Sequence, residues 1–195
     1  MQNSFNYGSF RGIGRGIALS FAKKGWQVAL NCRQNVEQLN ETKALVCKGG
    51  AKCAIFPADV SDYTQTEKLF GDIKQTFGGV DILINNAGIS IIGLFQDLSR
   101  ADWMRLMDQM SALFITAAIL PFRIWYMKNV EKLLTFLQSG GLAGASCEAA
   151  YSASKGAVNA LTRALAKELA PSNIQVNAIA CGAIDTDMNA FFKRR

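Results

Sequence analysis

The sequence predicts an α/β fold built on a doubly wound parallel sheet. Apolar runs of strand length alternate with amphipathic stretches of helix length along the chain, and this alternation is typical of parallel strands joined by right-handed helical crossovers. The chain has 195 residues, of which 50% are hydrophobic and 18% charged. That length suits one sizeable core and is short for two, so we expect residues 1–195 to form a single domain.

Periodicity, with glycine and proline at the boundaries, places the individual elements. We expect strands near 2–7, 26–31, 52–56, 80–84 and 174–180, and helices near 13–24, 34–48, 62–77, 100–120 and 150–170. Ser61 is a good N-cap for the third of these helices. The strand over 80–84 is apolar enough to be buried on both faces.

Two short motifs follow the first and fourth expected strands. The text over residues 8–14 is Gly-Ser-Phe-Arg-Gly-Ile-Gly, and a helical pattern follows it. Glycines there let the chain turn tightly and bring backbone N–H groups close to a pyrophosphate at a helix N-terminus. The text over 85–88 is Asn-Asn-Ala-Gly. Each motif alone is also ordinary turn material at the end of a buried strand.

A third motif pairs Tyr151 with Lys155 at the head of the helix expected over 150–170. Residues four apart share one face of a helix. An unperturbed tyrosine titrates near about 10, and a fixed positive charge favours its phenolate and lowers that pKa. The pair is therefore suited to proton transfer in alcohol and carbonyl chemistry, although a surface tyrosine and lysine also fall at this spacing by chance.

Together the three motifs resemble those of the short-chain dehydrogenase/reductase superfamily, in the same order and at similar distances, from about Gly8 to Asn189. The chain looks closest to bacterial 3-oxoacyl-acyl-carrier-protein reductases of fatty acid biosynthesis. A neighbouring branch, which reduces a ketone on modified translation elongation factor P, is also similar. The resemblance implies a Rossmann-type fold, a ketone substrate that is small or bound to a carrier protein, and assembly into a homo-oligomer.

The resemblance also implies the site residues. Tyr151 would be the acid that protonates the ketone oxygen, Lys155 its partner and a ligand of the nicotinamide ribose, and Ser139 the nearest available helper serine. Asp59 and Val60 would contact the adenine, and Ile184 and Thr186 would cover the carboxamide and diphosphate. The full implied set of cofactor-binding residues is Gly8, Arg11, Gly12, Ile13, Gly14, Arg33, Asp59, Val60, Asn86, Ala87, Gly88, Tyr151, Lys155, Gly182, Ile184 and Thr186.

Charge favours NADP(H) as the cofactor. In such sheets an acidic residue after the second strand accepts the ribose hydroxyls of NAD, whereas a basic one accommodates the extra phosphate of NADP. Here that strand is followed by Arg33, with no carboxylate nearby, and Arg11 in the glycine loop supplies a second cation. Both arginines are also ordinary surface residues when each is taken alone.

Several positions depart from the family pattern. The helper serine normally stands where this chain has Gln138, so Ser139 is one residue out of place and serves only if a local bulge realigns it. The relay asparagine is absent near Met110, and Cys181 replaces a usual proline. The strand over 2–7 is polar where relatives have an apolar run, and each missing buried aliphatic forgoes about 1.5–3 kcal/mol.

The family resemblance also implies that a substrate lid and one further strand would follow the last residues, so the chain is expected to be truncated. We hypothesise that these mismatches arose from small insertions, deletions or frame slips, which the coding DNA would test. The alternative hypothesis is therefore that the chain is a degraded family member, which binds nucleotide or associates with paralogues without catalysing a reaction.

Composition excludes several other classes of function. The chain has no histidine, so a Ser-His-Asp triad and a His-ligated zinc are ruled out. The five cysteines lack metal-site spacing and close pairing, which predicts reduced thiols, no bound metal and a cytoplasmic protein. A thiol enzyme using Cys147 or Cys181 would have no histidine to activate it. The net charge of +6 is scattered, which disfavours nucleic acid, and neither a signal peptide nor a membrane span is recognisable.

Overall fold

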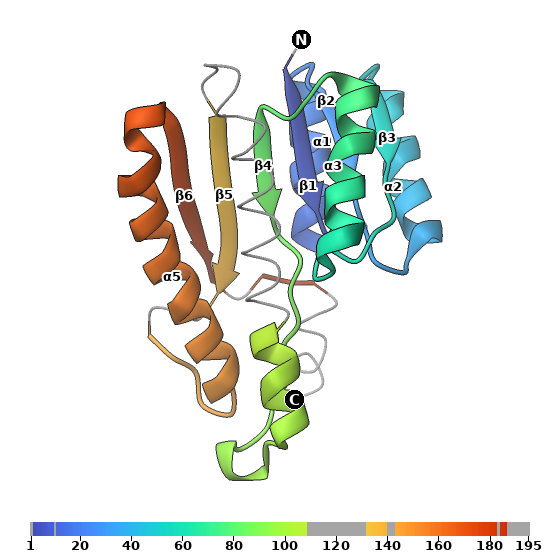
Figure 1. The fold of residues 1–195 in the computed structure, drawn as a ribbon. Helices are drawn as coiled ribbons and strands as arrows, with labels where there is room; N and C mark the ends of the chain where they lie inside the picture. The colour runs from blue at the N-terminus through green and yellow to red at the C-terminus, as the bar shows by residue number, and fades with distance from the viewer. Residues whose placement is uncertain (1, 10, 109–131, 140–142, 183, 187–195) are drawn as a thin grey trace.

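A parallel sheet forms the middle layer of the molecule, with helices on both faces (Figure 1). The computed structural model describes residues 2–9, 11–108, 132–139, 143–182 and 184–186, and the structural statements here concern those residues. The six strands, in the spatial order β3-β2-β1-β4-β5-β6, are β1 (Asn3–Tyr7), β2 (Gln27–Leu30), β3 (Cys53–Ile55), β4 (Ile82–Asn85), β5 (Lys132–Ser139) and β6 (Ile174–Cys181). The chain winds outward from β1 to β3, then crosses back to β4 and continues to β6.

Helices follow the strands as the alternating pattern predicts. They are α1 (Gly12–Lys23), α2 (Val36–Lys48), α3 (Tyr63–Phe77) and α5 (Ala149–Leu169), with short 3-10 turns η1 (Phe95–Asp97) and η2 (Ala170–Ser172). Residues 100–108 are also helical, and the remainder of the helix expected over 100–120 lies outside the described residues. Among the described helices, none combines the length and apolar character that crossing a bilayer requires.

The predicted fold class is confirmed, since all five strand pairings described are parallel. The helix bounds agree with the predicted ones to within about two residues, the usual uncertainty of helix ends. Strand β5 was not among the elements read from the sequence pattern. The five cysteines all lie within the described part of the chain and form no disulfide there.

One predicted cap is wrong. Asp62, and not Ser61, caps α3, because Asp62 Oδ1 accepts a hydrogen bond from the Gln65 backbone N–H at 2.9 Å. That hydrogen bond also lowers the pKa of the Asp62 carboxyl below its usual value. The Ser61 hydroxyl instead donates to Asp59 Oδ1 at 2.6 Å. Serine and aspartate are both favoured at this position, so adjacent candidates are not separated by the sequence alone.

The two faces of the sheet carry separate hydrophobic clusters. In β2, Val28 and Leu30 pack into the cluster beneath α1 and α2, whereas Ala29 between them joins the cluster beneath α3 and α5. Successive side chains of a strand point to opposite faces, so this division shows that the sheet is covered on both sides. Burial on both faces is the usual condition of a parallel sheet.

Strand β1 lies at the centre of the sheet although most of its side chains are polar. It pairs with β2 on one side and β4 on the other, and Phe5 is fully buried with its ring edge-on to Phe70 at 5.7 Å between centroids. The buried polar neighbours bond to backbone oxygens: Asn6 Nδ2 donates to Gly14 O at 2.7 Å and Ser4 Oγ to Gln27 O at 3.3 Å. The polar strand therefore ties the sheet to the start of α1.

Replacing Asn6 by alanine tests this tie. Asn6→Ala leaves the Gly14 carbonyl without its buried donor, which we expect to lower the free energy of unfolding by about 1–3 kcal/mol. Urea titration measures the change. The matched control is Asn40→Ala at an exposed position on α2, which should change stability by less than about 0.5 kcal/mol. Equal effects of the two substitutions would contradict the assigned role of Asn6.

Candidate active site

The carboxyl ends of β1 and β4 meet at one edge of the sheet, where the loops that follow them touch. Asn86 Nδ2 donates to Gly8 O at 3.0 Å. A Cβ atom added to Gly14 would lie 2.2 Å from Gly8 O and 2.8 Å from Asn86 Nδ2, so no other residue fits there. Gly8 has φ +66°, the left-handed region that glycine adopts without strain. The loop and the Asn-Asn-Ala-Gly turn thus form one closely packed cradle.

The cradle leads into the N-terminus of α1, which begins at Gly12. Arg11 holds the N-cap position without a side-chain capping bond, and backbone N–H groups in the first turn of a helix favour an anion. A Cβ on Gly12 would lie 3.3 Å from Thr186 Cγ2, so Thr186 reaches this end of the helix from beyond β6. A helix N-terminus without a side-chain cap, entered through a glycine loop, fits a dinucleotide diphosphate.

Tyr151 and Lys155 lie in the first turns of α5, and both are buried, with 6% and 7% of their surface exposed. Lys155 Nζ lies 5.3 Å from the centre of the Tyr151 ring. A Cβ on Gly88 would lie 3.7 Å from the same Nζ, so the structure brings this pair to the turn after β4. The predicted proton-transfer pair and the glycine cradle therefore share one edge of the sheet.

Burial lowers the pKa of the Lys155 ammonium from 10.5 to about 8, because the charged form loses water, while the nearby Cys181 acts in the opposite direction. At neutral pH the ammonium form still prevails. Ser154, next to Lys155, donates its hydroxyl to the Tyr151 backbone oxygen at 2.5 Å. A buried cation beside a phenol stabilises the phenolate more strongly than an exposed one, since water screens it less.

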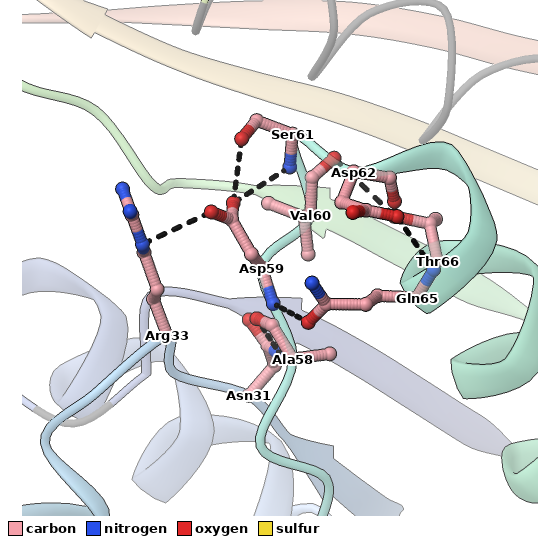
Figure 2. A network of polar contacts seen from close by, with 9 residues as sticks. All are labelled: Asn31, Arg33, Ala58, Asp59, Val60, Ser61, Asp62, Gln65 and Thr66. Atoms are coloured by element: carbon pink, nitrogen blue, oxygen red, sulfur yellow. Dashed lines mark hydrogen bonds and ion pairs between the residues drawn. The ribbon is translucent and has the colours of Figure 1, made fainter.

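The residues predicted to surround the adenosine lie together after β2 and β3 (Figure 2). Arg33 Nε contacts Asp59 Oδ2 at 3.0 Å, and Val60 is buried in the cluster beneath α3. Gly182 and Ile184 are exposed after β6. Ile13 is half-buried in the first turn of α1, and Ala87 lies against Gly8, whose added Cβ would be 3.0 Å from Ala87 Cα.

The predicted helper serine is not realigned within its strand. Backbone pairing between β5 and β6 runs without an extra residue from Lys132 to Ser139, with Gln138 opposite Ala180 and Ser139 opposite Cys181. The bulge that Ser139 would need in order to act as the helper serine is therefore absent from the β5–β6 pairing. The position near Met110, where a relay asparagine was sought, lies outside the described residues.

Three buried polar residues at the ends of β1 and β2 were missed by the sequence reasoning. Ser9 Oγ accepts from the Asn31 backbone N–H at 2.9 Å and donates to Asn6 O at 2.8 Å. Asn31 Nδ2 in turn donates to Phe56 O at 2.8 Å and Ala58 O at 3.1 Å. This network joins the ends of three strands. The only signal in the sequence is a polar residue directly after an apolar strand, which also describes an ordinary turn.

Comparison with known proteins agrees with this geometry. The sequence matches the family model described as short chain dehydrogenase over residues 6–195. It is 35% identical over 187 residues to nodulation protein G of Azospirillum brasilense, covering 93% of this chain and 74% of that protein. It is 29% identical over 182 residues to a 3-oxoacyl-[acyl-carrier-protein] reductase of Synechocystis, covering 93% and 73%. The structure of a short-chain type dehydrogenase/reductase from Mycobacterium marinum superposes with a TM-score of 0.92 at 27% identity, over 99% of this chain and 77% of that one.

The chain belongs to the short-chain dehydrogenase family of oxidoreductases, which confirms the resemblance seen in its motifs. Members of this family bind a nicotinamide cofactor. The glycine cradle, the uncapped start of α1 and the adjoining Tyr151 and Lys155 fit such a group.

Gly14 and Gly16 form a matched pair for testing the cradle. Gly14→Ala places a methyl group into Gly8 O, so we expect the loop to shift, nucleotide affinity to fall at least about tenfold and stability to drop. Gly16 has nothing within 4 Å of an added Cβ, so Gly16→Ala in the same helix should raise stability by about 0.5–1 kcal/mol. Thermal melts and calorimetric titration measure both. Retained affinity in Gly14→Ala would contradict the cradle.

The lowered pKa of Lys155 predicts a pH dependence of stability. Between pH 8 and 10.5 the unfolded lysine is protonated and the folded one is not, so the unfolded state binds more protons and stability rises with pH. Relative to Lys155→Met, the wild-type free energy of unfolding should therefore increase across this window, by up to about 3 kcal/mol. Urea titrations at several pH values measure it. Exposed Lys48→Met is the control, and parallel profiles for wild type and Lys155→Met would refute the burial effect.

Proposed function

We propose that this chain is an NADP-dependent reductase that converts a ketone to an alcohol, with Tyr151 as the acid. The observation that carries the proposal is the buried Lys155 ammonium, 5.3 Å from the Tyr151 ring and adjacent to the turn that closes the glycine cradle. A phenol with a desolvated cation beside it is an acid whose conjugate base is stabilised. Its place at the carboxyl edge of the sheet puts that acid where parallel α/β folds bind their ligands.

The residues of the chain take the following parts. Tyr151 donates its phenolic proton to the ketone oxygen as negative charge develops there, and Lys155 stabilises the phenolate that remains. When bound, the reduced nicotinamide supplies the hydride that the carbonyl carbon receives. Gly8, Gly14 and Asn86 hold the loop in the conformation that admits the diphosphate, and the first turn of α1 faces its charge.

The preference for NADP is proposed from the charge after β2. Arg33 is exposed and stands where an acidic residue would select NAD. Arg11, at the N-cap of α1, is exposed as well. We further propose a 3-oxoacyl thioester or similar ketone as substrate, a single domain, a cytoplasmic site of action and a homo-oligomeric assembly. The similarity to the 3-oxoacyl-[acyl-carrier-protein] reductase of Synechocystis supports this substrate class.

A second candidate function is a non-catalytic relative that binds nucleotide or associates with paralogues. The observation that favours it is the regular pairing of β5 with β6, which leaves Gln138 at the position of the helper serine. Without a second hydroxyl to polarise the ketone, Tyr151 alone would have to bring about the chemistry. Ser139→Ala is a test within the reductase candidate, since a catalytic Ser139 makes this change costly to turnover.

Tyr151→Phe tests the reductase proposal. Removing the phenolic hydroxyl should lower kcat for a 3-oxoacyl thioester model substrate by about 10²–10⁴-fold, while leaving NADPH affinity within about threefold because the ring remains in place. Absorbance of NADPH follows turnover, and calorimetry follows binding. Tyr63→Phe, at an exposed position on α3, is the control and should have no effect. A wild-type chain that binds NADPH but turns over no ketone in a substrate screen would favour the non-catalytic candidate.

A further inference from the structure

The segments after β2 and β3 are held side by side by one buried amide. Asn31 Nδ2, at the end of β2, donates to both Phe56 O and Ala58 O beyond β3. Asn31 is 2% exposed. Just beyond these bonds, Arg33 and Asp59 face each other with Nε and Oδ2 3.0 Å apart (Figure 2). The buried hydrogen bonds that join these two segments therefore hold Arg33 and Asp59 close together. Two mobile surface side chains would have no such constraint.

The Asp59 carboxylate is itself fixed. Its Oδ1 accepts hydrogen bonds from the Ser61 backbone N–H at 3.0 Å and from the Ser61 hydroxyl at 2.6 Å. The Asp59 backbone N–H donates to Gln65 Oε1 at 3.0 Å, and Gln65 lies in the first turn of α3. Only 23% of the Asp59 side chain is exposed. One carboxylate oxygen is thus committed to Ser61 and the other faces Arg33.

Arg33 contacts Asp59 through Nε alone, and its side chain is 62% exposed. A guanidinium has five N–H donors, and among the described residues the terminal nitrogens of Arg33 have no partner. Figure 2 shows these nitrogens extending beyond the contact with Asp59. Because the group is planar, a contact at Nε also restricts the orientation of the terminal pair, which is the arrangement that binds a phosphate in bidentate fashion.

Besides orienting the Arg33 guanidinium, Asp59 has two other effects on nucleotide binding. Its negative charge repels a phosphate and offsets part of the charge of Arg33, which would weaken phosphate binding. By family resemblance it also stands where the adenine is contacted, which would affect every adenine nucleotide equally. The carboxylate and a phosphate would use different donors of Arg33, Nε for one and the terminal nitrogens for the other, so the two anions do not compete for the same hydrogen bonds.

We propose that Asp59 is the positioning residue for Arg33, and that it selects the 2′-phosphate of NADP by holding the guanidinium plane toward it. This inference rests on the proposed preference for NADP. Ser61 supports the selection indirectly, because its two hydrogen bonds keep the Asp59 carboxylate turned toward Arg33. The ion pair thereby contributes to specificity between two cofactors that differ only in one phosphate.

Adenosine 2′,5′-bisphosphate and adenosine 5′-monophosphate differ only in the 2′-phosphate. Comparing them therefore separates an effect on phosphate binding from an effect on adenine binding. Calorimetric titration of the purified full chain gives the affinity for each. Arg33→Ala should weaken the bisphosphate by about 10–100-fold, as expected for hydrogen bonds to a charged group, and change the monophosphate less than about twofold. Asp59→Asn should weaken the bisphosphate by about fivefold or more and spare the monophosphate, because it loosens Arg33 without removing it.

The double variant Arg33→Ala/Asp59→Asn tests whether Asp59 acts through Arg33. Once Arg33 is gone, Asp59→Asn should cause no further loss of bisphosphate affinity. Ser61→Ala, which keeps all charges, should produce a smaller loss in the same direction as Asp59→Asn. Glu41→Gln is the matched control: it breaks the Arg15–Glu41 ion pair at 3.2 Å between α1 and α2 and should leave both affinities unchanged.

Three results would overturn the proposal. Equal losses for both nucleotides in Asp59→Asn would assign Asp59 to the adenine, and tighter binding of the bisphosphate would show that the carboxylate competes with the phosphate for Arg33. An Asp59→Asn effect that persists in full without Arg33 would exclude positioning. A different result, in which Arg33→Ala leaves discrimination between the two nucleotides unchanged, would refute the NADP preference itself. Retained monophosphate binding shows in each variant that the fold is intact.

Discussion

The contact between the glycine loop and the turn after β4 is the constraint on which the site depends. Gly14 approaches Gly8 O so closely that a single methyl group would not fit, and Asn86 bonds to the same oxygen. A regular sheet alone would leave these two loops independent. Their contact fixes the start of α1 relative to the turn after β4, which lies beside the Lys155 ammonium. The loop proposed to bind the diphosphate and the pair proposed to transfer the proton therefore lie at one edge of the sheet.

Polar and charged groups at that edge have separate tasks. Asn6 and Asn31 satisfy backbone oxygens and hold neighbouring segments together, so they are structural. Lys155 is different, because its burial favours the neutral amine and lowers its pKa to about 8. The site tolerates this unfavourable burial, and functional sites are where perturbed pKa values gather. Arg33 and Asp59 belong to a third group, partly exposed and placed where an anionic ligand would meet them.

Much of the fold was predictable because its signals are local. Helical periodicity and glycine boundaries placed α1, α2, α3 and α5, and three short motifs indicated the loops that meet at the site. Two of the features that the sequence did not predict depend on contacts distant in sequence. The hydrogen bonds of Ser9 with Asn31, 22 residues apart, leave only a polar residue after a strand as their signal in the sequence, and the Arg33–Asp59 pair leaves no pattern there. The choice of Asp62 over Ser61 as cap was settled by backbone geometry that two adjacent capping residues do not reveal.

The central claim is that this edge of the sheet forms a working nucleotide site despite its polar first strand. The most direct measurement is a titration of the purified chain with NADPH and with NADH, followed by energy transfer from its tryptophans to the bound nicotinamide. The account predicts saturable binding that is tighter for NADPH than for NADH. Absence of binding to a folded sample would contradict it, because the glycine cradle and the buried Lys155 would then be remnants of a site that no longer assembles.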